Sequence, residues 1–151
     1  MPRFFVPGIP QPGGSKRGFI HRHTGRVVVV EDAKRNKDWR TSVMQVAREM
    51  LAGHEPLVGP VRLDVTFTMP RPKGHYGSGK NAGSLKMSAP RFHTVKPDRT
   101  KLLRSTEDAL TQCGMCWRDD TQIVTGQVTK IYGEQPGALI QFEAAETPNL
   151  F

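Results

Sequence analysis

The sequence has only two cysteines, no long apolar run and fewer acidic than basic residues. Its 151 residues contain no stretch of about eighteen apolar residues, so we expect no membrane-spanning helix. The N-terminal stretch MPRFFVPGIP has one basic residue, and two prolines interrupt its apolar part, which is not the pattern of a signal peptide. We therefore expect a cytoplasmic protein that does not act at a membrane.

The two cysteines, Cys113 and Cys116, are spaced as CxxC. This spacing occurs in redox pairs and in half of a zinc site. No second Cys/His pair stands at zinc spacing, and the pair falls at the end of a predicted helix. Redox pairs instead use a helix N-terminus, where the dipole favours the thiolate. The pattern therefore favours small, half-buried residues over redox or zinc chemistry.

The shortage of acids leaves a strongly basic chain. Lys and Arg number 22 against 14 Asp and Glu, for a net charge of +8 and a pI of about 9.9. Such an excess indicates a polyanionic partner, usually nucleic acid, although a merely basic surface is the alternative.

The length and the hydrophobic pattern predict one α+β domain over residues 1–151. Hydrophobic content is 36%, and 15 Gly with 12 Pro indicate long irregular segments. We expect a mainly antiparallel, mixed sheet with two helices covering one face. The expected strands are 3–9, a hairpin over 18–31 that turns at Thr24-Gly25, then 61–69, 122–132 and 138–145. The expected helices are 32–52 and 99–112.

Side-chain periodicity assigns faces to these elements. Residues 61–69 alternate between apolar and polar, which places Asp64 on a solvent-facing side. Helix 32–52 carries one apolar stripe: Trp39, Val43, Val46, Ala47, Met50 and Leu51. Helix 99–112 and the residue after it gather Leu102, Leu103, Thr106, Ala109, Leu110 and Cys113 on one side. Lys101, Arg104 and Asp108 lie on nearly the opposite side.

Residues 71–96, RPKGHYGSGKNAGSLKMSAPRFHTVK, contain six Lys or Arg and no acid. We expect a flexible, structureless basic loop that captures phosphates, although an insertion without function is the alternative. The DNA-binding residues predicted in and just after this loop are Lys73, Lys80, Lys86, Arg91, Lys96 and Arg99.

Three aspartates are the candidate catalytic carboxylates. Asp119 and Asp120 stand in CWRDDTQIV before a predicted strand, and Asp98 follows Lys96-Pro97 at the start of a predicted helix. One interpretation makes Asp98 a helix N-cap and the other two a polar turn. In the other, the three converge and require a divalent cation such as Mg²⁺, while Lys101 and Arg104 bind phosphate oxygens. The helix is about 20 Å long, so spacing alone does not establish that they meet.

The segment KPDRTKLLRSTEDALTQCGMCWRDDTQIV resembles the central signature of the RusA family of Holliday-junction resolvases. That pattern runs K/R-P-D-x-D-N/K-L-x-K/R, then D-A-L, then G-x-W-x-D-D-x-Q-V/I. Residues that fall into it are Lys96, Pro97, Asp98, Lys101, Leu102, Arg104, Asp108, Ala109, Leu110, Trp117, Asp119, Asp120, Gln122 and Ile123. The match is dense over about thirty residues, and the order of the elements before it fits more loosely.

The resemblance implies a RusA-like fold and an endodeoxyribonuclease that needs Mg²⁺, with Mn²⁺ as a possible substitute and no small-molecule cofactor. It further implies a homodimer that binds branched DNA and nicks two strands symmetrically, in a bacterial host and of phage or prophage origin. By position, Asp98, Asp119 and Asp120 correspond to the metal-binding acids, and Arg104 to a lysine important for activity.

One position departs from the family pattern. Thr100 stands where the second acid of D-x-D is usual. Either three acids suffice, helped by Asp108, or the protein binds junctions with weak or absent cleavage. Pro97-Asp98 also suggests a PD-(D/E)xK nuclease, but no E/D-x-K follows on a strand.

A homodimer is also expected from the residues. Symmetric cutting of a two-fold substrate is most simply done by a C2 dimer. The apolar strands 4–6 and 27–30 are the predicted contact surfaces.

Overall fold

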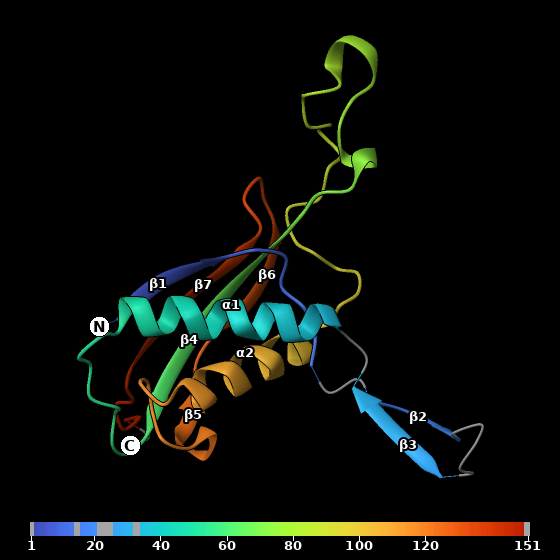
Figure 1. The fold of residues 1–151 in the computed structure, drawn as a ribbon. Coiled ribbons are helices and arrows are strands. Elements are labelled where there is room, and N and C mark those ends of the chain that lie inside the picture. The colour runs from blue at the N-terminus through green and yellow to red at the C-terminus, as the bar shows by residue number, and fades with distance from the viewer. Residues whose placement is uncertain (1, 14–15, 21–25, 32–33, 150–151) are drawn as a thin grey trace.

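The computed structural model describes residues 2–13, 16–20, 26–31 and 34–149. Its body is a five-stranded sheet with two helices (Figure 1). The strands of this sheet are β1 (Arg3–Pro7), β4 (Val61–Met69), β5 (Ile123–Thr125), β6 (Val128–Tyr132) and β7 (Gly137–Ala144). The helices are α1 (Lys34–Met50) and α2 (Arg99–Cys113), and Figure 1 shows them side by side across one face of the sheet. The predicted α+β architecture is confirmed.

Two strands stand apart from this sheet. β2 (Lys16–Ile20) and β3 (Val27–Glu31) pair antiparallel with each other and form a separate sheet. The predicted turn Thr24-Gly25 lies outside the described residues, as does the predicted helix start at Asp32. The side chains of the predicted contact strand 27–30 also lie outside the described part.

The central strand β4 pairs along both edges. β7 runs antiparallel to it, and β1 in turn runs antiparallel to β7. On the other edge, β5 and then β6 run parallel to β4. The predicted continuous strand 122–132 is therefore wrong, because the chain breaks at Gly126, which has φ 149°. The next residue, Gln127, donates its backbone N–H to the side-chain Oδ1 of Asp64 at 2.8 Å, and its carbonyl accepts from the N–H of Val65 at 2.9 Å.

The core lies between the sheet and the helices. The inward side chains of β4 are all buried, as the alternation predicts: Val61, Leu63, Val65, Phe67 and Met69. The stripe of α1 packs as predicted except at its end, where Met50 is 60% exposed. Met50 is the last residue of α1, and the residue after it, Leu51, is buried in the core.

Each tryptophan is buried with its indole N–H satisfied. Trp117 Nε1 donates to Thr111 Oγ1 at 2.8 Å, and Trp39 Nε1 donates to Thr106 Oγ1 at 3.2 Å. Thr106 in turn donates to the carbonyl of Leu102 at 3.0 Å. A buried indole without such a partner loses the hydrogen bond it makes to water, so these bonds fix how α2 sits on the core.

The dimer contact at residues 4–6 stays a prediction: β1 is an edge strand whose Phe5 is half-buried, while its other two apolar side chains belong to the core. Phe4 is 4% exposed and Val6 is 0% exposed, because both side chains face the core rather than solvent. No helix in the described part of the chain is long and apolar enough to cross a membrane.

The break at Gly126 generates a stability prediction. Gly126→Ala should lower the free energy of unfolding by about 3 kcal/mol, because a Cβ there overlaps the backbone carbonyl of Leu63 and φ is positive. The measurement is urea denaturation. Gly83→Ala is the control, since a Cβ there meets no atom within 4 Å. Equal midpoints for the two variants would contradict the role of Gly126.

Candidate active site

The start of α2 presents Asp98 as a free carboxylate. Asp98 occupies the N-cap position with extended backbone angles, yet its side chain makes no capping hydrogen bond. Its backbone carbonyl instead accepts the helical bond from Leu102 at 3.1 Å. The side chain is exposed, so the carboxylate is open to ligands. The N-cap interpretation is confirmed for the position of Asp98 and not for its side chain.

Lys130, on β6, fixes the segment that leads into Asp98. Its Nζ donates to the carbonyl of Val95 at 3.0 Å and to that of Pro97 at 2.8 Å. Partial burial lowers the pKa of Lys130, and the nearby Asp98 carboxylate opposes that shift. Sequence analysis missed Lys130, because it sits in an ordinary strand with no motif around it.

Asp119 and Asp120 lie on a short 3₁₀ turn, η3 (Asp120–Gln122). Asp119 Oδ1 accepts from the backbone N–H of Thr121 at 2.9 Å, and Gln122 Oε1 accepts from that of Asp119 at 3.1 Å. These two bonds form a reciprocal cap, and the Thr121 N–H lowers the pKa of Asp119 below its ordinary value. Asp119 thus has a structural bond, and Asp120 is the exposed first residue of η3.

Gln122 ties this turn to the rest of the molecule. Its Nε2 donates to the carbonyls of Leu57 and Gly59, each at 2.9 Å. The acidic pair is therefore held against the loop that precedes β4. Gln122 belongs to the matched signature, but its sequence context does not reveal this role.

The structure brings Asp120 close to the middle of α2 rather than to its start. Burial raises the pKa of the half-buried Glu107 above its ordinary value, and the charges of Asp120 and Asp108 raise it further. Glu107 follows Asp98 by nine positions, which is a rise of about 14 Å along a helix. Asp98 and the pair Asp119–Asp120 therefore face different parts of α2.

The predicted three-aspartate ion site is not assembled in this arrangement. No group of three His, Cys, Asp or Glu residues in the described ranges is placed to hold a metal ion. Ligand oxygens around Mg²⁺ lie only about 2.1 Å from the ion, so its ligands must converge. The assignment of Asp98, Asp119 and Asp120 as joint metal ligands remains a prediction that the conformation seen here does not fit.

Cations occupy the surface between the acids. Lys101 and Arg104 are both exposed on α2, after Asp98 and before Glu107 and Asp108. We call the row Asp98, Lys101, Arg104 and Asp108 the charged strip of α2. Exposed cations of this kind bind non-bridging phosphate oxygens, and exposed carboxylates accept hydrogen bonds from water or hold cations.

The basic loop (residues 71–96) has structure of its own, so the prediction of a structureless segment is wrong. Two 3₁₀ turns, η1 (Lys73–His75) and η2 (Gly79–Asn81), lie within it. Tyr76 and Leu85 form a β-bridge across the loop. Gly- and Ser-rich segments satisfy their backbone locally through such turns, which hydrophobic periodicity does not reveal.

The base of the basic loop is anchored to β6. Arg71 donates to the carbonyl of Pro90 at 2.8 Å, and its guanidinium lies 5.3 Å from the centre of the Tyr132 ring. His93 N–H donates to the carbonyl of Lys130 at 3.2 Å. Burial lowers the pKa of His93, with Lys130 adding to the effect.

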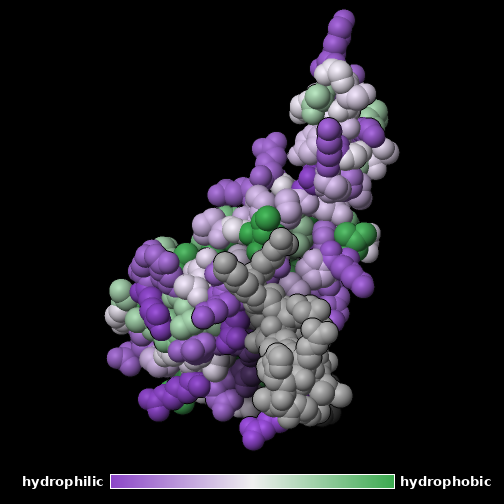
Figure 2. Space-filling view, turned by 45° about the vertical axis from the view of Figure 1, so that its right-hand side comes forward, coloured by the Kyte–Doolittle hydropathy of each residue, from purple (hydrophilic) through white to green (hydrophobic). Residues whose placement is uncertain are grey.

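The rest of the basic loop extends away from the body. Figure 2 shows it as a narrow projection with a hydrophilic outermost end. All six predicted DNA-binding residues are exposed: Lys73, Lys80, Lys86, Arg91, Lys96 and Arg99.

The remaining candidates have structural roles. Asp64 pairs with Arg62 at 3.0 Å, and its pKa is lowered because hydrogen bonds from Arg62 and Gln127 outweigh the opposing effect of partial burial. Cys116 is buried, and burial raises the pKa of its thiol to about 12. Cys113, the last residue of α2, is half-buried, and Cys116, which follows the C-cap Gly114, is buried, so both pack as predicted.

Comparison with known proteins gives two similarities. The family model described as "Endodeoxyribonuclease RusA" matches residues 7–143. The chain is also 33% identical over 137 residues to "Uncharacterized protein YqaN" of Bacillus subtilis (strain 168), and the alignment covers 89% of each chain. The family match includes the whole charged strip of α2 and the turn η3.

The burial of Glu107, together with the repulsion from nearby acids, generates a pH prediction. A carboxyl with a raised pKa binds more protons in the folded than in the unfolded state, so stability falls as pH rises through that pKa. Glu107→Gln should therefore raise the thermal midpoint at pH 7, and its advantage should shrink below the ordinary glutamate pKa. Calorimetry at several pH values measures this. The exposed Glu55→Gln is the control, and an equal gain in both variants would contradict the prediction.

Proposed function

Because the chain belongs to the RusA endodeoxyribonuclease family, we propose that it binds four-way DNA junctions as a homodimer and hydrolyses phosphodiester bonds in two strands. The family match supports a junction-resolving endodeoxyribonuclease. The homodimer, the symmetric cut and the Mg²⁺ requirement go further than that match and are part of this proposal. Mn²⁺ is the expected substitute ion.

The observation that carries the proposal is the charged strip of α2. An exposed carboxylate, Asp98, adjoins two exposed cations, Lys101 and Arg104, on one helix surface. The cations suit the non-bridging oxygens of a backbone phosphate, and the carboxylates at either end suit the orientation of water. A polyanionic strand that lies along α2 contacts both the cations and the carboxylates of the strip. A small neutral ligand would not require charges at this spacing.

In the proposed hydrolysis, different residues of the chain bind the phosphate, orient the water and support the turn η3. Lys101 and Arg104 hold the phosphate and stabilise the charge that develops on it. Asp98 or Asp120 accepts a hydrogen bond from a water molecule and orients it for attack. Asp119 keeps the η3 turn in shape through its bond to Thr121. A divalent ion would lower the pKa of water bound to it, but the three aspartates do not converge to hold such an ion in this structure.

A second candidate is a junction-binding protein with weak or absent cleavage. Thr100 replaces an acid of the family signature and is exposed in the first turn of α2. The separation of Asp98 from Asp119 and Asp120 also favours it. A threonine hydroxyl carries no charge, so it does not replace a carboxylate as a Mg²⁺ ligand.

One cleavage experiment tests both candidates. A synthetic four-way junction and a linear duplex are incubated with the wild-type chain, with and without Mg²⁺ or Mn²⁺. We expect cleavage of the junction only, and only with the ion. Asp120→Asn should slow cleavage about 100-fold or more while junction binding is retained. Glu134→Gln is the control, since Glu134 is an exposed acid in the turn before β7.

Thr100→Asp separates the two candidates. If the missing acid limits catalysis, this variant should cleave faster than the wild type at equal junction affinity. Junction retardation without nicking by the wild type, at any ion concentration, would overturn the nuclease and leave the binding protein. Loss of retardation altogether would overturn both.

The basic loop generates a salt prediction. Changing both Lys80 and Lys86 to Ala should reduce the slope of log affinity against log salt by about 1.8, because each lost phosphate contact releases about 0.9 fewer counterions. Filter binding between about 50 and 200 mM salt measures it. Arg48→Ala, in the last turn of α1, is the control and should leave the slope unchanged. A slope that is the same in all three proteins would contradict a DNA-binding role for the loop.

A further inference from the structure

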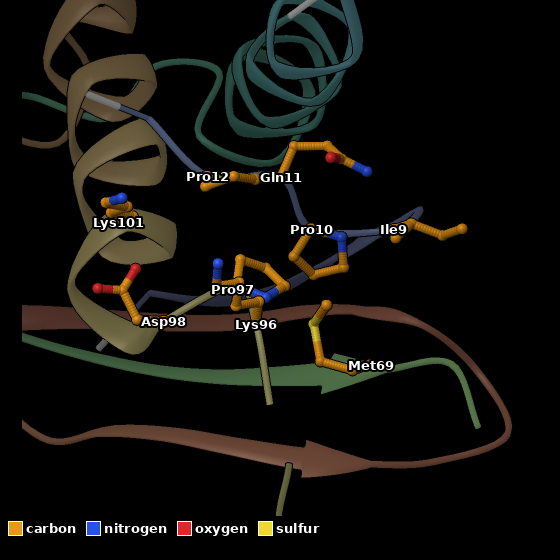
Figure 3. Close-up of a pocket in the computed structure, with 9 residues that line it drawn as sticks. All are labelled: Ile9, Pro10, Gln11, Pro12, Met69, Lys96, Pro97, Asp98 and Lys101. Atoms are coloured by element: carbon orange, nitrogen blue, oxygen red, sulfur yellow. The ribbon is translucent and has the colours of Figure 1, made fainter. Parts of the chain in front are cut away.

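A pocket of about 570 Å³ opens beside Asp98 (Figure 3). On one side lies the segment Ile9–Pro12, and on the other lie Lys96, Pro97 and the first turn of α2. Met69, at the end of β4, closes the pocket from below, as Figure 3 shows. We call this the Asp98 pocket.

Hydrogen bonds at both ends hold the first wall of the Asp98 pocket. Gly8 N–H donates to the carbonyl of Pro136 at 3.1 Å, before the wall begins. Gly13 N–H donates to the carbonyl of Lys101 at 2.8 Å, directly after it ends. Between these, Ser105 Oγ donates to the carbonyl of Gln11. The segment 9–12 is thus fastened to α2 although it belongs to no helix or strand.

The second wall is fixed from the sheet. Lys130 donates to the carbonyls of Val95 and Pro97, on either side of Lys96. Because hydrogen bonds hold both walls, the pocket is formed before a ligand binds. A preformed site loses less conformational entropy on binding than one that must order itself.

The chemistry of the lining selects the ligand. Ile9, Pro12 and Pro97 offer apolar surface that is not fully buried. Lys96 and Lys101 add two exposed cations, which outnumber the one exposed carboxylate of the lining, Asp98. A ligand that satisfies both parts has a flat, weakly polar ring joined to an anion. A single nucleotide has this composition, and the volume lies within the usual range for small-ligand pockets.

Duplex DNA does not offer such a ligand, because its bases are paired and stacked with only their edges accessible. A branch point does, since bases at a disrupted stack cost the least to turn outward. We propose that the Asp98 pocket accepts one unpaired nucleotide at the branch point. Its base lies against Ile9, Pro12 and Pro97, and its phosphate faces Lys96 and Lys101. This inference rests on the proposed function and adds the feature of DNA that the site recognises.

The test uses 2-aminopurine, whose fluorescence rises when the base leaves the stack. A four-way junction with 2-aminopurine at the branch point is titrated with the full chain in EDTA, so that no cleavage occurs. We expect a fluorescence rise that saturates with junction binding. The same base placed in the middle of an arm should give no rise.

A matched pair of variants locates the effect. Ile9→Asp puts a negative charge in the pocket at a residue that is 52% exposed, so the fold should tolerate it. We expect about tenfold weaker junction binding, as for the loss of one stacked base, and no fluorescence rise. Val58→Asp, at an 88% exposed residue that does not line the pocket, should behave as the wild type.

The outcomes distinguish this inference from the proposed function. Junction binding without a fluorescence rise in the wild type overturns the pocket and leaves the nuclease in place. Equal behaviour of Ile9→Asp and Val58→Asp overturns it as well. Failure of the wild type to bind any branched DNA overturns the proposed function itself, and the pocket with it.

Discussion

The backbone pairing of β4 along both edges is the constraint on which the rest of the structure depends. β5 and β6 run parallel to β4, so the chain must travel from the end of β4 back to its beginning before β5 starts. The basic loop and α2 make that return. Asp98, at the start of α2, therefore lies beside Met69 at the far end of β4. Asp120 begins η3, which directly precedes β5, and the first residue of β5 pairs with Val61 at the near end. The sheet topology itself separates the acids.

This separation shapes the electrostatics of the site. Asp98 and the acids of η3 lie far enough apart that their repulsion is weak. Lys101 and Arg104 lie on α2 between them. The repulsion that persists is local, between Glu107, Asp108 and Asp120. An alternation of cations and acids along a helix matches an extended phosphate backbone better than a compact anion. The positive charge of the rest of the molecule attracts the same partner over longer distances.

The sequence predicts the helices and strands well and the tertiary contacts between them poorly. The alternation in β4 and the stripe of α2 fix their buried faces because burial acts on each element separately. The break at Gly126 escapes prediction, since it depends on the approach of Leu63 from another strand. The signature identifies Asp98, Asp119 and Asp120. The distance between Asp98 and the other two depends on the parallel pairing of β5 and β6 with β4, which the spacing within the signature does not encode. Lys130 and the segment 9–12 also enter the site only through folding, because neither belongs to a motif.

The basic loop is closed at its base, where Arg71 meets Pro90 and residues 91–93 run beside β6. The outer part between these anchors contributes no residue to the Asp98 pocket. Changes of length or sequence within residues 76–89 therefore leave these anchors and the lining of the Asp98 pocket in place. Under the proposed function, such changes would alter how this projection contacts nucleic acid without changing α2 or the pocket beside it.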